Sequence, residues 1–281
     1  MAPVTEPHPP DRPDPIESSP REELEGATPL HLPMSPVAAE LPRPVAVAAV
    51  AVAALLLAAA ALAGYAATLG LTLALALVLA ATWPAVSGSL TPGATSLVLG
   101  ASALLIVGSA LRDDLRWVAA AVAFGVVLSF FHQLLRAPGR EGLVLSLLAS
   151  FGGLALLASA ATMAGLSHRP ATRGFVVVAM VAVVAALLAD VLGGAAVLRP
   201  FLSVVAFVAA LLAAVVAAQW FDSVDVLDAA GLGAAVGVVS WSFRRVLSGQ
   251  AAMLGARGQV ATGVGSVFVT GALVHLYGII A

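Results

Sequence analysis

The chain has 281 residues, of which 61% are hydrophobic and only 10% charged, and its formal net charge at pH 7 is -2. A soluble globular domain carries roughly 25% charged residues, so this composition excludes a soluble protein and predicts a polytopic membrane protein. The absence of cysteine excludes disulfides and thiolate chemistry, and all 13 basic residues are arginine, as expected of a GC-rich bacterial genome.

The first 43 residues form a polar segment that precedes the first apolar run. They contain eleven prolines, and eight acidic residues stand against three arginines. Such a segment has too little apolar surface to fold, so we expect a disordered, partly polyproline-II tail at 1–43. A signal peptide is not expected, because the apolar stretch begins only at Pro44 and its upstream flank is acidic. The tail is interpreted either as a plain solvated tether or as a binding segment for a protein partner.

From Pro44 onward the chain consists of apolar runs that are long enough to cross a membrane. A helix needs about 20 apolar residues to cross a hydrocarbon core about 30 Å thick. The uncharged stretch 44–83 is twice that length, so we expect two helices joined by a tight turn near Gly64 to Gly70. Further spans are expected at 94–111, 115–135, 142–165, 174–197, 201–220, 226–243 and 258–280. The predicted fold is therefore all-α, a polytopic transmembrane helix bundle of about nine spans over residues 44–281.

The arginines between the spans indicate the orientation, because loops rich in Lys and Arg stay on the cytoplasmic side. Nine spans with a cytoplasmic amino terminus place seven arginines inside and four outside. The inner arginines are Arg43, Arg136, Arg140, Arg199, Arg244, Arg245 and Arg257, and the outer ones are Arg112, Arg116, Arg169 and Arg173. We therefore expect a multi-pass protein of the cell membrane with a cytoplasmic amino terminus and an external carboxyl terminus.

The stretch SFFHQLLRAPGREG, residues 129–142, separates the fourth and fifth predicted spans. His132 is near the cytoplasmic end of the fourth helix, and Arg136 follows four residues later on the same helical face. One interpretation is the polar border of a span, with aromatic and arginine side chains at the lipid headgroups. The other is part of a functional site, which requires a partner inside the membrane at the same depth.

Asp190 is the candidate partner, because it falls within the apolar run 174–197 in the sequence LLADVLGG. If the helix covers that whole run, Asp190 lies roughly 5 Å past its midpoint. An ionisable group at such a depth usually faces the bundle interior and has a partner, which makes it a candidate functional residue. If the helix instead ends at Leu192, Asp190 lies at the interface near Arg199. The expected companions on the cytoplasmic side are His132, Arg136, Arg244 and Arg245.

His275 is the second polar residue inside a predicted span. Gly271 precedes it by four residues and Gly278 follows it by three, so the histidine lies on a smooth face that favours helix packing. We expect it to point inward, either as a packing residue with satisfied ring nitrogens or as a ligand. The predicted topology places it in the outer half of the membrane, at a different depth from Asp190.

The eighth predicted span carries charges at both ends. Arg244 and Arg245 end it in WSFRRVLSGQ, where they either anchor the helix or bind an anionic lipid or a substrate phosphate. Three aspartates lie just before this span or in its first turn: Asp222, Asp225 and Asp228. At a helix start, capping by carboxylates is favoured over a divalent-cation site.

The motifs of familiar catalytic sites are absent from the sequence. The chain has no G-x-x-x-x-G-K-[ST], no H-E-x-x-H and no G-x-S-x-G. The spans also lack paired carboxylates of the kind that hold magnesium and a pyrophosphate. We therefore expect no catalytic residue, no metal and no cofactor.

The layout of length, about nine spans and a late arginine pair resembles phosphatidate cytidylyltransferases. The lysine-containing C-terminal signature of that family has no counterpart, because the chain has no lysine, and its acidic metal-binding residues are not matched. No catalytic residue is carried over. The pattern of RDDLRW at 112–117, FFHQLLR at 130–136 and a glycine-rich late span is similar to multi-pass membrane proteins of GC-rich actinobacteria, a resemblance that implies no activity.

Three functions are compatible with these features. A small permease is favoured by Asp190, His275 and the glycine pairs Gly152-Gly153 and Gly233-x-x-x-Gly237, where close helix contacts or hinges are expected. A membrane scaffold is favoured by the acidic tail, and a lipid-modifying enzyme would use Arg244 and Arg245 on a head group. The expected partners are the lipid bilayer and an anionic lipid at the arginine pair, without nucleic acid.

Overall fold

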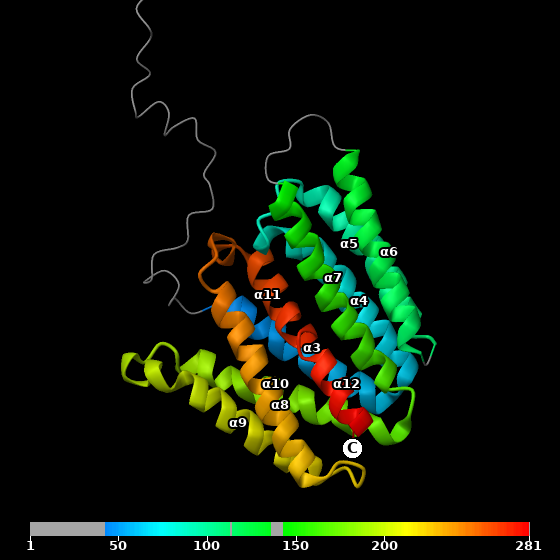
Figure 1. Cartoon of the computed structure of the whole chain (residues 1–281). Helices are drawn as coiled ribbons and strands as arrows, with labels where there is room; N and C mark the ends of the chain where they lie inside the picture. The colour runs from blue at the N-terminus through cyan, green and yellow to red at the C-terminus, as the bar shows by residue number, and fades with distance from the viewer. Residues whose placement is uncertain (1–42, 113, 136–142, 281) are drawn as a thin grey trace, which may run out of the picture. The chain divides into compact units, whose positions relative to one another are not determined.

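The computed structural model describes residues 43–112, 114–135 and 143–280, and the described part is helical without strands (Figure 1). Its helices are α3 (Pro44–Ala63), α4 (Tyr65–Val86), α5 (Pro92–Ser109), α6 (Leu115–Leu134), α7 (Leu143–Leu166), α8 (Arg173–Leu192), α9 (Leu202–Ala218), α10 (Val226–Leu247), α11 (Ala256–Phe268) and α12 (Gly271–Ile280). Short 3₁₀ helices precede α8, α9 and α11: η1 (Pro170–Thr172), η2 (Ala196–Phe201) and η3 (Ala251–Leu254). The predicted tail, apart from Arg43, and Arg136 lie outside the described residues.

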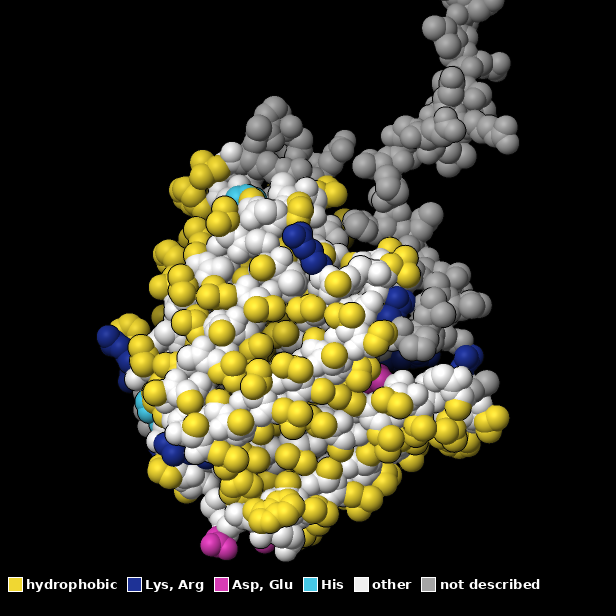
Figure 2. Space-filling model, turned by 180° about the vertical axis from the view of Figure 1, so that it is seen from behind, with side chains coloured by type: hydrophobic (Ala, Val, Ile, Leu, Met, Phe, Trp, Pro, Cys, Tyr) yellow, Lys and Arg dark blue, Asp and Glu magenta, His cyan; other side chains and the backbone are white. Residues whose placement is uncertain are grey.

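Nine helical segments of the described chain are long and apolar enough to cross a membrane, which confirms the predicted all-α membrane fold. Many large apolar side chains on the outer faces of the helices are exposed, among them Leu104, Leu148 and Leu212. Figure 2 shows one such face, where hydrophobic side chains predominate and charged side chains are few. An apolar surface of this extent requires lipid around it, so the protein is an integral membrane protein.

The apolar stretch 44–83 forms two helices, as its length predicted. Gly64 alone connects α3 to α4, and its φ of 124° lies in a region that only glycine adopts readily. The turn is fixed by neighbouring residues: the Tyr65 hydroxyl donates to the Ala110 carbonyl at 2.6 Å, and the His168 ring stacks on Tyr65. We call the end of the bundle that holds this turn the Gly64 end.

The helices form two packed groups with α3 and the last span between them. In one group α5 and α7 contact each other and both contact α4 and α6, and in the other α8, α9 and α10 contact one another. The helix α3 contacts α8 and α4, while α11 contacts α3, α4 and α10, so both join the groups. Figure 1 shows α3 and α11 in the middle of the described helices, with α9 to one side and α6 to the other.

The helices approach closely where glycine replaces a side chain. A methyl group at Gly237 of α10 would lie 2.3 Å from the Cβ atom of Ala210 in α9, and one at Gly233 would lie 2.3 Å from Cβ of Ala214. A methyl group at Gly153 would similarly meet the Leu99 side chain at 2.7 Å. The close helix contacts expected at both glycine pairs are confirmed.

Two predicted spans differ from the observed helices. The span expected at 174–197 ends at Leu192, because Gly193 and Gly194 weaken the helix and the η2 turn follows them. The span expected at 258–280 is divided at Val269 and Thr270 into α11 and α12. β-Branched residues and the following glycine all have low helix propensity, which accounts for a break at this position.

Candidate functional site

The charged centre of the described helices is an ion pair between Asp190 and Arg244. Asp190 is in the last turn of α8 and Arg244 in the last turn of α10, and these helices pack against each other. The Arg244 Nη2 and Nε atoms lie 2.6 Å and 2.9 Å from the same oxygen, Asp190 Oδ2. The Arg244 side chain is 5% exposed and that of Asp190 25% exposed, so the guanidinium is inside the bundle and the carboxylate at its edge.

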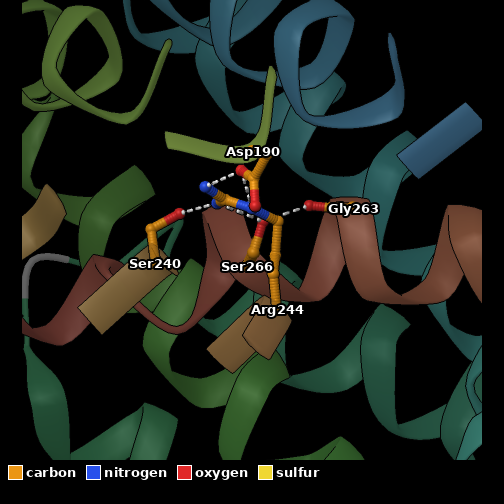
Figure 3. A network of polar contacts seen from close by, with 5 residues as sticks. All are labelled: Asp190, Ser240, Arg244, Gly263 and Ser266. Carbon is orange, nitrogen blue, oxygen red and sulfur yellow. Dashed lines mark hydrogen bonds and ion pairs between the residues drawn. The ribbon is translucent and has the colours of Figure 1, made fainter. Parts of the chain in front are cut away.

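Two serines complete the surroundings of the guanidinium (Figure 3). Arg244 Nη1 donates to the Ser240 hydroxyl at 2.6 Å, one helical turn earlier on α10, and has a longer contact of 3.5 Å with the Ser266 hydroxyl on α11. The Ser266 hydroxyl in turn donates to the Gly263 carbonyl at 2.8 Å. A buried charge needs such a set of partners, because each unsatisfied donor in a low-dielectric interior costs free energy.

Of the residues expected to accompany Asp190, the structure brings Arg244 to it. The expectation that Asp190 lies well inside its span is wrong, because α8 ends at Leu192 and Asp190 is in its last turn. The alternative of a helix ending at Leu192 is confirmed, and Asp190 and Arg199 line one cavity. The Arg244 side chain reaches Asp190 from the neighbouring helix α10.

This cavity has a volume of about 490 Å³, and we call it the arginine cavity. In the part of the chain that the structure describes, its charged lining residues are Arg43, Arg199, Arg244, Arg245 and Asp190. The four arginines and one aspartate give this lining a formal charge of +3. Its apolar lining includes Val47 and Ala51 of α3 and Trp241 of α10.

A smaller cavity of about 170 Å³ lies at the Gly64 end and is lined by His275, Arg112, Asp114 and Arg169 among others. His275 is half-buried, and the flanking glycines pack as expected. A methyl group at Gly271 would lie 2.1 Å from the Ser159 carbonyl oxygen, and one at Gly278 would meet Leu166. The cavity rim carries Asp114, whose pKa is held below its usual value by a hydrogen bond from the Arg116 side chain.

His132 is not among the residues that line the arginine cavity. Its helix α6 packs against α5 and α7, in the group of helices that does not contain Asp190. His132 itself is half-buried near the end of α6. The other half of the expected HQLLR site, Arg136, lies outside the described residues.

Of the three aspartates expected at the start of α10, Asp225 has the predicted capping role. Asp225 is the N-cap residue, and its side chain accepts a hydrogen bond of 2.8 Å from the Leu227 amide. Asp228 follows in the first turn, where a carboxylate interacts favourably with the helix dipole. Among residues 43–112, 114–135 and 143–280, no group of three His, Asp or Glu side chains is arranged to hold a metal ion.

Sequence reasoning missed a row of hydroxyls in the last span. Thr262, Ser266 and Thr270 follow one another at intervals of four, and each is 0% exposed. We call these three residues the hydroxyl row. The spacing places them on one helical face, and that periodicity was the available signal. Sequence reasoning named Arg199 as a neighbour of Asp190 only in the alternative with a helix end at Leu192. It missed Arg43, which is distant in the sequence and lines the same cavity.

Comparisons of the chain with protein-family models, with curated proteins and with solved structures find no match.

Proposed function

We propose that this integral membrane protein is a small permease and that the arginine cavity is its substrate site. The observation that carries the proposal is that a cavity of about 490 Å³ reaches the Asp190–Arg244 ion pair. Ionisable residues in membrane spans are costly and commonly mark substrate or ion pathways. Ligand sites typically have volumes of about 300–1,000 Å³, so the cavity has the size of a small-molecule site.

The hydroxyl row supports a path for the substrate from the arginine cavity to the smaller cavity at the Gly64 end. Thr262 lines the arginine cavity, while His275, further along the same span, lines the smaller cavity at the Gly64 end. At 1.5 Å per residue the two positions are about 20 Å apart along the helices. Ser266 and Thr270 lie between them, and their hydroxyls donate to carbonyls of their own helix, which leaves oxygen lone pairs for a passing ligand.

The break between α11 and α12 supports movement along that path. Discontinuous helices at the middle of a bundle are common in secondary transporters, where they contribute to substrate sites. Here the break at Val269 and Thr270 falls between the two cavities, on a span that contacts both groups of helices. With the amino terminus cytoplasmic, as the arginines predict, the arginine cavity opens toward the cytoplasm and the smaller one toward the outside.

The absence of cysteine provides a test that needs no known substrate. Single cysteines at Thr262 and Thr270 are treated with a membrane-impermeant thiol reagent from each side of oriented vesicles. In a permease, Thr262→Cys reacts from the side of the arginine cavity, and Thr270→Cys reacts from both sides as the path opens alternately. Ala103→Cys, also at a fully buried position but in α5, is the matched control and stays unreactive.

The alternatives give different results. In a membrane scaffold the bundle stays closed, so Thr270→Cys is as unreactive as Ala103→Cys from either side, and that result would overturn the permease. A lipid-modifying enzyme working at the arginine cavity needs access from one side only. Labelling of Thr262→Cys without any labelling of Thr270→Cys would therefore favour that alternative.

A further inference from the structure

The lining of the arginine cavity combines positive charge at its mouth with an apolar wall. Arg199 and Arg245 are exposed there, Arg43 is half-buried, and Asp190 is the one acidic residue among the described residues that line it. Because Asp190 is already within 2.6 Å of Arg244, its charge is matched inside the bundle. Among the described lining residues, arginines therefore outnumber carboxylates by four to one.

The apolar wall extends the cavity toward the membrane interior. Along α3 its lining runs from Pro44 to Ala51 and includes Val47. Seven residues of helix correspond to about 10 Å, or roughly a third of a hydrocarbon core about 30 Å thick. Trp241 and Leu202 contribute further apolar surface from α10 and α9. A ligand that fills this space needs an apolar part as well as an anionic one.

We propose that the arginine cavity binds a phosphate group joined to an apolar chain, as in an anionic phospholipid. Arginine is suited to this role because its planar guanidinium donates several hydrogen bonds to phosphate oxygens. Basic pockets between transmembrane helices bind anionic lipid headgroups in the same way. The phosphate contacts Arg199 and Arg245, and the chain lies along the α3 wall. This inference rests on the proposed function in taking the cavity as the substrate site, but it concerns binding alone.

The test uses the full chain in mixed micelles of unlabelled phosphatidylcholine. A small fraction of phosphatidylglycerol with brominated chains is added, because bromine quenches tryptophan fluorescence at short range and Trp241 lines the cavity. We expect saturable quenching that is lost in Trp241→Phe. Brominated phosphatidylcholine, with the same chains and no net charge, gives only the weak quenching of random contact.

Two arginine variants show whether the cavity is responsible. Arg245→Gln and Arg199→Gln should each weaken phosphatidylglycerol binding roughly fivefold, the size expected when one arginine facing an anionic headgroup is removed. Arg257→Gln is the matched control, because Arg257 is exposed near the start of α11 and is not among the residues that line the cavity. Its binding should equal that of the wild type.

Inorganic phosphate separates the two sources of the phosphate group. It is added as a competitor, and it should displace the brominated lipid only at concentrations far above those of phosphatidylglycerol. Displacement by phosphate as effective as that by unlabelled phosphatidylglycerol would show that the apolar chain adds nothing and would overturn the proposed lipid. Equal losses in Arg257→Gln and Arg245→Gln would overturn the cavity as the site. Binding that persists while Thr270→Cys stays unreactive would contradict the permease and leave this inference standing.

Discussion

Arg244 is a buried charged residue whose stability in the bundle depends on its partners. Its guanidinium is 5% exposed and depends on Asp190 for its counter-charge and on Ser240 for a further hydrogen bond. Taking one partner of a buried pair away leaves an uncompensated charge and costs about 3–5 kcal/mol, whereas an exposed pair is worth about 0–1 kcal/mol. The exposure of Asp190, 25%, places this pair between those limits.

We predict that Asp190→Asn destabilises the protein more than the double change Asp190→Asn with Arg244→Gln. In the single variant the buried guanidinium loses its counter-charge, and in the double variant neither member of the pair is charged. The loss in the single variant should be about 2–4 kcal/mol, with at least about 1 kcal/mol recovered in the double. Thermal unfolding of the purified proteins in lipid nanodiscs measures both.

The control for the ion pair is His132→Ala. His132 belongs to α6 and is not among the residues that line the arginine cavity, so its effect should simply add to that of Asp190→Asn. Wild-type stability in Asp190→Asn would show that the carboxylate is only part of a polar border. A non-additive effect of His132→Ala would show that it is coupled to Asp190 after all.

At the scale of helices, α9 and α10 pack closely because α10 has glycine at two positions of their contact. Gly233 and Gly237 present a flat surface to Ala214 and Ala210, and the two backbones come close. In a bilayer, helix association depends on such van der Waals contact because lipid tails are as apolar as the helices themselves. The position of α10, and with it that of Arg244, therefore depends on the two glycines, which have no methyl group to hold the helices apart.

We predict that Gly237→Ala destabilises the protein by about 1–3 kcal/mol, the usual cost of overpacking a filled interface. The added methyl would lie 2.3 Å from Cβ of Ala210, so α9 and α10 must separate. Gly100→Ala is the matched control inside α5, where a methyl group would meet no atom within 4 Å. It should be neutral or stabilising by up to about 1 kcal/mol, since alanine favours helix. Equal unfolding temperatures for the two variants would contradict the close contact.

The helices were largely predictable because a membrane imposes a length on them. The uncharged run 44–83 was expected to turn near Gly64 to Gly70 and does so at Gly64, and the glycine pairs predicted the close contacts. The end of α8 at Leu192 was only one of two alternatives, and the break at Thr270 was not predicted, because hydropathy does not distinguish a helix from an apolar turn. Those turns are stabilised by tertiary packing, for example of Gly271 against the backbone of Ser159.

The candidate site was predictable only in part, because the cavity depends on how segments from the whole molecule pack together. Asp190 and Arg244 stand out as charges in apolar sequence, and the set of expected partners did include the right one. That Arg43 and Arg199 share their cavity depends on how α3, α8 and η2 meet at one end of the bundle. No periodicity within one segment carries that information.

We predict that the carboxyl terminus is external and the amino terminus cytoplasmic. An odd number of spans, nine in the described part of the chain, requires the two termini to be on opposite sides. The arginine distribution then selects which side is which. A reporter that is active only outside the cell, fused after residue 281, should be active. Activity restricted to a cytoplasmic reporter at the same position would contradict the orientation.

The single-residue connection at Gly64 has a consequence for biosynthesis. Because α3 and α4 are joined by one glycine, the first two helices form a hairpin with almost no connecting chain. When such a hairpin enters the bilayer as a unit, only its tip has to cross. Residues 44–83 of the hairpin contain no charged side chain. The acidic segment before Pro44 then stays on the side where the ribosome made it. In the orientation that we predict, the eight carboxylates of the first 43 residues therefore do not have to cross the membrane.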